Sequence, residues 1–215
     1  MIAKGGEGYG VAAGSDLIIK GGGKVEASSI EEAAIWADGN IDISGGSQVK
    51  ASSQGDLAVD AEGSLAVTNA SLDASGVEYG VYAYKGVTLD HATVTVRTSA
   101  SGGQAIALIT DGDDIVIKNG SIVDAFAEGK FSVAISTRNH QPNVAGGHIY
   151  ISDSVVKAIA RYIETGGDGP DHYSNDQSGG VIPEPRGLNI GIFAQTYEGI
   201  TPASISIVRS KVTAE

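Results

Sequence analysis

Five aspartates of this chain lie in glycine-rich stretches and could bind a metal ion. They are Asp111, Asp113, Asp168, Asp171 and Asp176. Oxygen ligands on a flexible backbone suit Ca²⁺. The stretch GGDGPDHYS, which holds two of them, also matches one copy of the nonapeptide that binds Ca²⁺ when it is stacked in tandem. The alternative is a set of ordinary solvated acidic loops and turns, so Ca²⁺ is the one cofactor that the sequence suggests.

A second group of side chains could do acid–base chemistry. Asp111, Arg138 and His140 occur at turns of the second half of the chain. In a polysaccharide lyase or hydrolase an arginine would neutralise a uronate, and a histidine or aspartate would move a proton. Glycoside hydrolysis generally uses two carboxylates, which Asp113 or Asp114 and Glu198 could supply. The spacing does not specify such a site, so binding without catalysis is the preferred interpretation.

Two aromatic residues complete the candidate binding residues. Trp36 and Tyr82 occupy equivalent outward positions of an alternating pattern, two repeats apart, which corresponds to roughly 10 Å in a stack of strands. Aromatic faces at such intervals can stack on sugar rings. The alternative is that they pack against a loop or a neighbouring domain. The candidate ligand-binding residues are therefore Trp36, Tyr82, Arg138, His140, Tyr197 and Glu198.

These residues lie within an internal repeat that occurs seven times, and each copy has three apolar markers. The first marker is Val11, Ile35, Val59, Val81, Ile106, Ile135 and Ile192. The second is a pair: Leu17/Ile19, Ile41/Ile43, Leu65/Val67, Val87/Leu89, Ile115/Ile117, Ile149/Ile151 and Ile205/Ile207. The third is also a pair: Val25/Ala27, Val49/Ala51, Leu72/Ala74, Val94/Val96, Val123/Ala125, Val156/Ala158 and Val212/Ala214.

The repeat predicts an all-β fold. Apolar residues two apart share one face of a strand, and about 24 residues per early unit leave no room for a helix between three strands. Stacked units bury what a single unit cannot. The prediction is a single-stranded right-handed parallel β-helix, a solenoid of about seven coils with three short strands each. A β-sandwich is the alternative.

The outward residues of the third strand fit this register. In one column opposite charges are expected on neighbouring coils, namely at Glu26–Lys50, Lys50–Asp73 and Asp124–Lys157. Pairs of this kind contribute roughly 0.2–1 kcal/mol each. We assign them a structural role only.

Departures from the repeat are where function is expected, because binding residues favour loops on a rigid scaffold. The turn between first and second strands lengthens at 110–114, 137–148 and 195–204, which would form a wall at one corner of the C-terminal coils. A second long insertion covers 160–189. Irregular loops of this length are usually functional or disordered.

Composition limits the classes of partner. The net charge is −12, with 14 basic and 26 acidic residues, so nucleic acid is not an expected partner. The chain has no cysteine, which excludes disulfides and thiolate metal sites. No run of 18 apolar residues is present, so we expect no membrane insertion of this segment.

The chain reads as one β-helix domain over 1–215, with insertions at 137–148 and 160–189. The repeat pattern is already present near the first residues and ends within a coil, and neither end shows the pattern of a capping helix. We therefore expect a segment of a longer protein whose signal and anchor lie elsewhere.

Three phrases of the repeat, LIIKGGGKVEASS, IDISGGSQVKASS and IVIKNGSIVDAFA, resemble the coils of pectate-lyase-like right-handed β-helices. They resemble more closely the carbohydrate-binding β-helix domains of bacterial surface proteins. The resemblance covers nearly the whole chain except the insertions, and it implies an extracellular or wall-attached bacterial module for polysaccharide or adhesion. The calcium aspartates and the arginine of pectate lyases have no clear counterpart on the strands here, which weakens the lyase interpretation.

The expected function is a non-catalytic β-helix module of a secreted or cell-surface bacterial protein. Its partner would be a polysaccharide or other glycan, or another surface protein in adhesion. The alternatives are a polysaccharide lyase or glycoside hydrolase of the pectate-lyase-like class, and a structural spacer.

Overall fold

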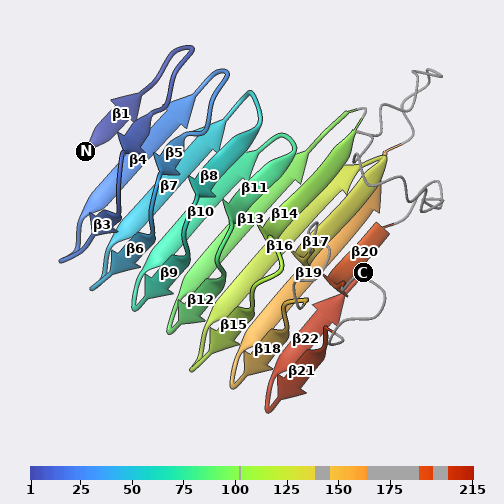
Figure 1. Ribbon diagram of the computed structural model, residues 1–215. Helices are drawn as coiled ribbons and strands as arrows, with labels where there is room; N and C mark the ends of the chain where they lie inside the picture. Colours follow the sequence, from blue (N-terminus) through green and yellow to red (C-terminus); the bar gives the residue numbers. More distant parts are fainter. Residues whose placement is uncertain (102, 139–145, 164–188, 196–202) are drawn as a thin grey trace.

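The computed structural model describes residues 1–101, 103–138, 146–163, 189–195 and 203–215. Within these ranges every regular element is a β-strand and every strand pairing is parallel. Each strand pairs with its equivalent in the coil before and the coil after, so that the coils stack as rungs (Figure 1). The predicted parallel β-helix is confirmed, and the β-sandwich is excluded because its antiparallel pairs do not occur here.

The strands form three parallel sheets, which we name A, B and C. Sheet A holds the third strands: β1 (Ile2–Lys4), β4 (Lys24–Ser29), β7 (Gln48–Ser53), β10 (Ser71–Gly76), β13 (Thr93–Ser99), β16 (Ile122–Gly129), β19 (Val155–Tyr162) and β22 (Lys211–Ala214). Sheet B holds the first strands: β2 (Val11–Ala13), β5 (Ile35–Ala37), β8 (Leu57–Ala61), β11 (Tyr79–Ala83), β14 (Gln104–Thr110), β17 (Phe131–Thr137) and β20 (Asn189–Ala194). Sheet C holds the second strands: β3 (Leu17–Ile19), β6 (Ile41–Ser44), β9 (Leu65–Thr68), β12 (Val87–Asp90), β15 (Ile115–Lys118), β18 (Ile149–Ser152) and β21 (Ile205–Val208).

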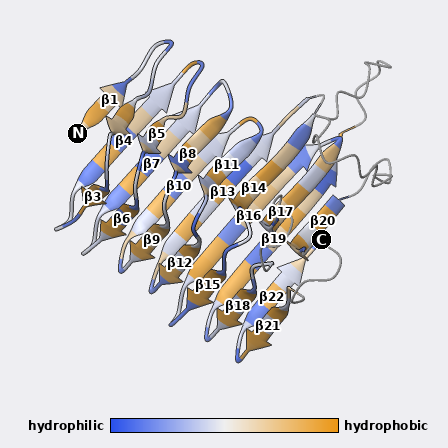
Figure 2. Cartoon of the chain, viewed as in Figure 1, coloured by the Kyte–Doolittle hydropathy of each residue, from blue (hydrophilic) through white to orange (hydrophobic). Residues whose placement is uncertain are grey.

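The interior is lined by the apolar columns that the repeat predicts. In sheet C, Ile41 and Ile43 face inward with no exposed surface and pair with Leu65 and Val67 of the next rung. In sheet A the equivalent columns run from Val25 and Ala27 through every later rung. The alternation of apolar and polar residues along the strands is visible in Figure 2. The register of the second and third markers is therefore confirmed at every rung, although Ile205 and Ile207 of the last rung are 44% and 49% exposed.

The first marker is wrong at one coil. Val81 pairs with Leu108, and Leu108 pairs with Ile135, so Leu108 is the inward residue and Ile106 is not. The reason is that Ala107 and Leu108 both face the core, which breaks the simple alternation on which the prediction relied. Ile106 consequently points to the outer side of sheet B, where it belongs to a separate cluster.

The same break recurs along sheet B as a column of small residues next to the large inward ones. Its members include Ala34, Ala58, Gly80, Ala107, Ala134 and Gly191. At Gly80 an added methyl group would overlap the Val96 side chain of sheet A, and at Gly191 it would lie 2.8 Å from Ala214 Cβ. These two glycines are required because sheets A and B approach each other closely at this corner.

One strand boundary and one rung differ from the prediction. Strand β1 adds an eighth rung to sheet A, with Ala3 paired to Ala27. Strand β19 continues to Tyr162, so the first residues of the expected 160–189 insertion are still strand. There Arg161 lies over the Phe126 ring of the preceding rung, with its Cζ 5.3 Å from the ring centroid.

The predicted opposite-charge neighbours of sheet A are confirmed by the register. Lys50 is the register partner of Glu26 and of Asp73, and Lys157 is that of Asp124. No ion pair of 4.0 Å or less joins these neighbours. Asp124 instead accepts a hydrogen bond from Nη2 of Arg97 at 2.9 Å. Arg97 lies two residues beyond the register partner of Asp124 on β13, and its long side chain reaches the carboxylate with a fixed fork of donors.

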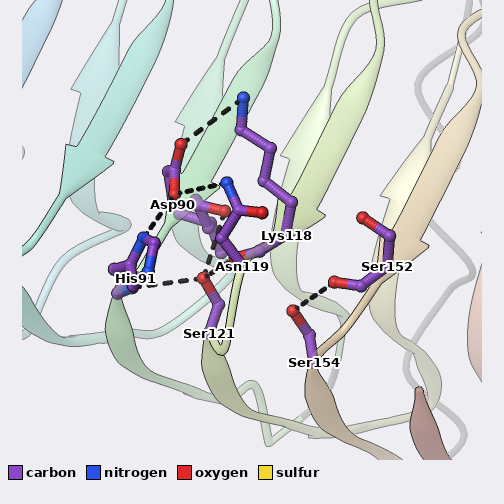
Figure 3. Close-up of polar contacts among 9 residues, drawn as sticks. Asp90, His91, Lys118, Asn119, Ser121, Ser152 and Ser154 are labelled. Atoms are coloured by element: carbon purple, nitrogen blue, oxygen red, sulfur yellow. Dashed lines mark hydrogen bonds and ion pairs between the residues drawn. The ribbon is translucent and has the colours of Figure 1, made fainter. Parts of the chain in front are cut away.

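The corner between sheets C and A is held by a ladder of polar contacts (Figure 3). Asp90 accepts hydrogen bonds from Asn119 Nδ2 at 2.9 Å and lies 2.8 Å from His91 Nδ1 and 3.4 Å from Lys118 Nζ. The Asn119 hydrogen bond, followed by His91 and Lys118, lowers the pKa of Asp90. Ser121 Oγ accepts the Ala92 N–H at 3.1 Å and donates to the Lys118 carbonyl at 2.7 Å.

Candidate binding face on sheet B

The outer face of sheet B carries most of the candidate residues that the structure describes. In the register of this sheet Trp36 pairs with Asp60, and Asp60 pairs with Tyr82. Trp36 and Tyr82 are thus outward and two rungs apart, about 10 Å, as predicted. The rung between them carries a carboxylate, which the sequence analysis did not include among the binding residues.

The two predicted aromatic residues each belong to a group of rings. Tyr9 stacks on Trp36, with ring centroids 5.2 Å apart and an interplanar angle of 19°. Tyr82 contacts Tyr79 edge-on at 5.4 Å and Tyr84 at 4.6 Å. Tyr9 is 40% exposed and Tyr84 is 38% exposed, while Trp36 and Tyr82 are half-buried. The most accessible rings of this face are therefore Tyr9 and Tyr84, which sequence reasoning missed.

An apolar cluster continues the aromatic face toward the C-terminal rungs. Ile106, Ile109 and Val133 are buried on the outer side of sheet B, apart from the main core. The partly buried residues packed against them are Tyr79, Tyr82, Phe131, Ile190 and Phe193. This cluster fixes the rings of Tyr79 and Tyr82 in place, because both pack against it.

Two carboxyl groups on this face have raised pKa values. Asp60 lies on β8 and Asp56 directly precedes that strand. Each has one buried oxygen, Oδ1, without a hydrogen-bond partner in the described part of the chain. Burial, with Glu62 and Asp56 nearby, raises the pKa of Asp60 to about 6. Burial, with Glu78 and Glu32 nearby, likewise raises the pKa of Asp56 to about 6.

Arg138 reaches the aromatic group from the end of β17. Its backbone N–H donates to the Thr110 carbonyl at 3.0 Å, and its Nη1 lies 3.5 Å from Gln104 Oε1. Gln104 Nε2 in turn donates to the Tyr79 hydroxyl at 3.3 Å. Arg138 and Asp111 do not form an ion pair with each other. Arg138 is instead linked through Gln104 to Tyr79.

The TDGDD turn after β14 is organised by its own hydrogen bonds. Thr110 Oγ1 donates to the Asp113 carbonyl, and Asp114 Oδ1 accepts the His148 N–H at 2.7 Å. Burial and the neighbouring Asp114 and Asp111 raise the pKa of Asp113. Asp111 has a buried Oδ1 without a hydrogen-bond partner among the described residues. No group of three or more His, Cys, Asp or Glu side chains that could hold a metal occurs where the chain is described, and Ca²⁺ binding by Asp111 and Asp113 stays a prediction.

Several predicted residues lie outside the described part of the structure. They are His140, Tyr197, Glu198, Asp168, Asp171 and Asp176. The lengthened turns at 137–148 and 195–204 and the 160–189 insertion are described only at their edges. The proposed loop wall and the roles of these six residues therefore stay predictions.

The surface chemistry differs between the faces of the solenoid. The corner of sheets C and A pairs Asp90 with Lys118, and Asp153 with Arg209 through two hydrogen bonds of 2.6 and 2.7 Å. On sheet B, Asp56 and Asp60 have no such partner among the described residues. One feature of the sequence could have indicated this site, namely Asp60 between Trp36 and Tyr82 in the outward column. The burial of Asp60 and its lack of a basic partner among the described residues can be seen only in the folded structure.

Comparison with known proteins adds no relative to this picture. The described residues contain no helix that is long and apolar enough to cross a membrane. No protein-family model, curated protein or solved structure matches the chain.

Proposed function

We propose that this chain is a non-catalytic module of a secreted or cell-surface bacterial protein, and that it binds carbohydrate on the outer face of sheet B. The single observation that carries the proposal is the column Trp36, Asp60, Tyr82 on three successive rungs. Aromatic rings stack on the apolar faces of sugars, and a carboxylate accepts hydrogen bonds from sugar hydroxyls. A linear polymer lying along the solenoid axis would contact an aromatic ring, a carboxylate and a second aromatic ring in turn.

The arrangement of the rings supports this proposal. Tyr9 and Trp36 form one stack, and Tyr79, Tyr82 and Tyr84 form a second group, with the Asp60 rung between them. Two ring surfaces separated along one direction suit an extended ligand better than a compact one. The partly exposed carboxylate of Asp60 further favours a ligand rich in hydrogen-bond donors.

Retention on insoluble polysaccharides tests the proposal. Trp36→Ala and Tyr84→Ala should each weaken retention about two- to tenfold, because aromatic stacking is worth about 0.5–1.5 kcal/mol. Tyr150→Ala is the matched control, since Tyr150 is a 39% exposed tyrosine on the outer face of sheet C. Equal retention of all three variants and the parent chain would refute a binding role for sheet B. A chain retained by no polysaccharide would favour the spacer.

The enzymatic alternative is favoured by one observation, the raised pKa of Asp56 and Asp60 to about 6. A carboxyl group whose pKa lies close to neutral pH can act as a general acid. A lyase or hydrolase would release unsaturated uronates or reducing ends, and Asp60→Asn or Asp113→Asn should then abolish the release. Binding without release under the same conditions would support the module rather than the enzyme.

A further inference from the structure

Two carboxylates on the binding face have no basic partner among the residues that the structure describes. Some carboxylates of the other faces do have one: Arg97 lies 2.9 Å from Asp124, and Arg209 lies 2.6 Å from Asp153. Within the described residues no lysine, arginine or histidine lies within 4.0 Å of Asp56 or Asp60. Like charges instead surround them, namely Glu32, Glu62 and Glu78. A ligand with positive charge would supply the compensation that the fold omits.

The surroundings of Asp60 suit an organic cation in particular. The aromatic side chains of Trp36 and Tyr82 are its neighbours on the rungs before and after. Ring faces attract cations, most strongly where water is excluded, and a carboxylate forms short, strong hydrogen bonds with an ammonium group. Oδ1 of Asp60 is buried and unpartnered, whereas the side chain as a whole is half-exposed, so one side of the carboxylate stays open to a ligand.

We propose that the ligand of this face is a polysaccharide of amino sugars with free, protonated amines, which bind at Asp60 between the two aromatic groups. The inference rests on the proposed function and names its substrate class. The sugar rings stack on the outer tyrosines, and an ammonium group donates to the open oxygen of Asp60. Uronate polymers are disfavoured, because their carboxylates would lie beside Asp56, Asp60 and Glu62.

Isothermal titration with short oligosaccharides of equal length tests this proposal. The probes are glucosamine, N-acetylglucosamine and galacturonate oligomers, with a lysine oligopeptide of similar charge as a comparison. The measurements are made near neutral pH at about 0.15 M salt, where the Debye length is about 8 Å and distant charges are screened. The chain has a net charge of −12, so any polycation would feel a general attraction, and the variants must separate that attraction from a site.

Asp60→Asn and Asp73→Asn provide this separation, because they change the net charge equally and differ only in the face affected. Asp73 is exposed on the outer face of sheet A. We expect the glucosamine oligomer to bind most tightly, and Asp60→Asn to weaken it about tenfold or more while Asp73→Asn changes it less than about twofold. Equal losses in the two variants would mean general charge attraction and would overturn the proposal.

The remaining outcomes distinguish this inference from the proposed function. Tighter binding of the N-acetylated or uronate oligomer, still weakened by Trp36→Ala, would overturn the amino-sugar inference and leave carbohydrate binding intact. Binding of the lysine peptide as tight as that of the glucosamine oligomer, with the same loss in Asp60→Asn, would mean a basic protein partner and would overturn it too. No binding of any sugar would overturn both.

Discussion

Replacing Asp60 by asparagine should stabilise the fold near pH 8 and leave it unchanged near pH 4. The pKa of Asp60 is raised to about 6 from an ordinary value of 3.8, chiefly by burial. The folded chain therefore holds this proton more tightly than the unfolded chain does. The free energy of unfolding falls as the pH rises from about 4 to above 6, because over that window the folded state binds more protons. Asparagine has the same shape and does not ionise, so it removes this loss.

The size of the effect follows from the same pKa. A change from 3.8 to about 6 corresponds to about 3 kcal/mol, at about 1.4 kcal/mol per pH unit. Asp60 is only half-buried, so solvent screening reduces this value to roughly 1–2 kcal/mol. For a chain of this length the melting temperature near pH 8 should rise by about 2–8 °C.

Urea unfolding followed by tryptophan fluorescence measures the effect. Trp36 is the single tryptophan of the chain and lies on the rung next to Asp60. Parent, Asp60→Asn and Asp73→Asn are compared near pH 4 and near pH 8, with far-ultraviolet circular dichroism as an independent probe. A gain for Asp60→Asn near pH 8 alone is expected, and no gain is expected for Asp73→Asn. An increase in the free energy of unfolding that is the same at both pH values, or a decrease near pH 8, would refute the conclusion that ionised Asp60 destabilises the fold.

Two further predictions concern the solenoid itself. Gly80→Val should destabilise the fold by about 1–3 kcal/mol, because its side chain would overlap Val96 across the corner of sheets A and B; an unchanged urea midpoint would contradict this close approach. Ser121→Ala should cost about 1–3 kcal/mol, because the buried Ala92 N–H and Leu89 carbonyl lose a partner at the corner of sheets C and A; Ser75→Ala, on the outer side of sheet A, should change the midpoint little.

The sequence predicted sheets A and C well because their strands alternate strictly. Ile41 and Ile43, for example, face the core, and Asp42 between them faces outward. Sheet B was harder, since two adjacent residues such as Ala107 and Leu108 both face the core. A period of two cannot represent such a pair, and the assignment of Ile106 failed for this reason. The eighth rung at β1 was missed because three residues are too few to show a period.

The candidate site was predicted only in part, for a physical reason. Alternation is sufficient to place Trp36 and Tyr82 on the outer surface, because it depends on residues close in sequence. The register places Asp124 beside Lys157 as predicted, but an ion pair depends on side-chain reach, and Asp124 pairs with Arg97 of the preceding rung. The burial of Asp60 depends on neighbouring rungs and on Asp56 and Glu62, which the pattern of one strand does not specify.

A solenoid confines function to its outward side chains, because each inward position must match the rungs on both sides. Sheet A and its corner with sheet C use the outward positions for stability, as in the pairs of Asp124 and Asp153 with arginines. Sheet B uses them differently, since Asp56 and Asp60 are partly buried and have no basic partner where the structure is described. A carboxylate that lowers stability near neutral pH has no structural benefit in the free chain, and a ligand that compensates its charge would provide one. The same substitution, Asp60→Asn, should therefore raise stability and weaken binding together.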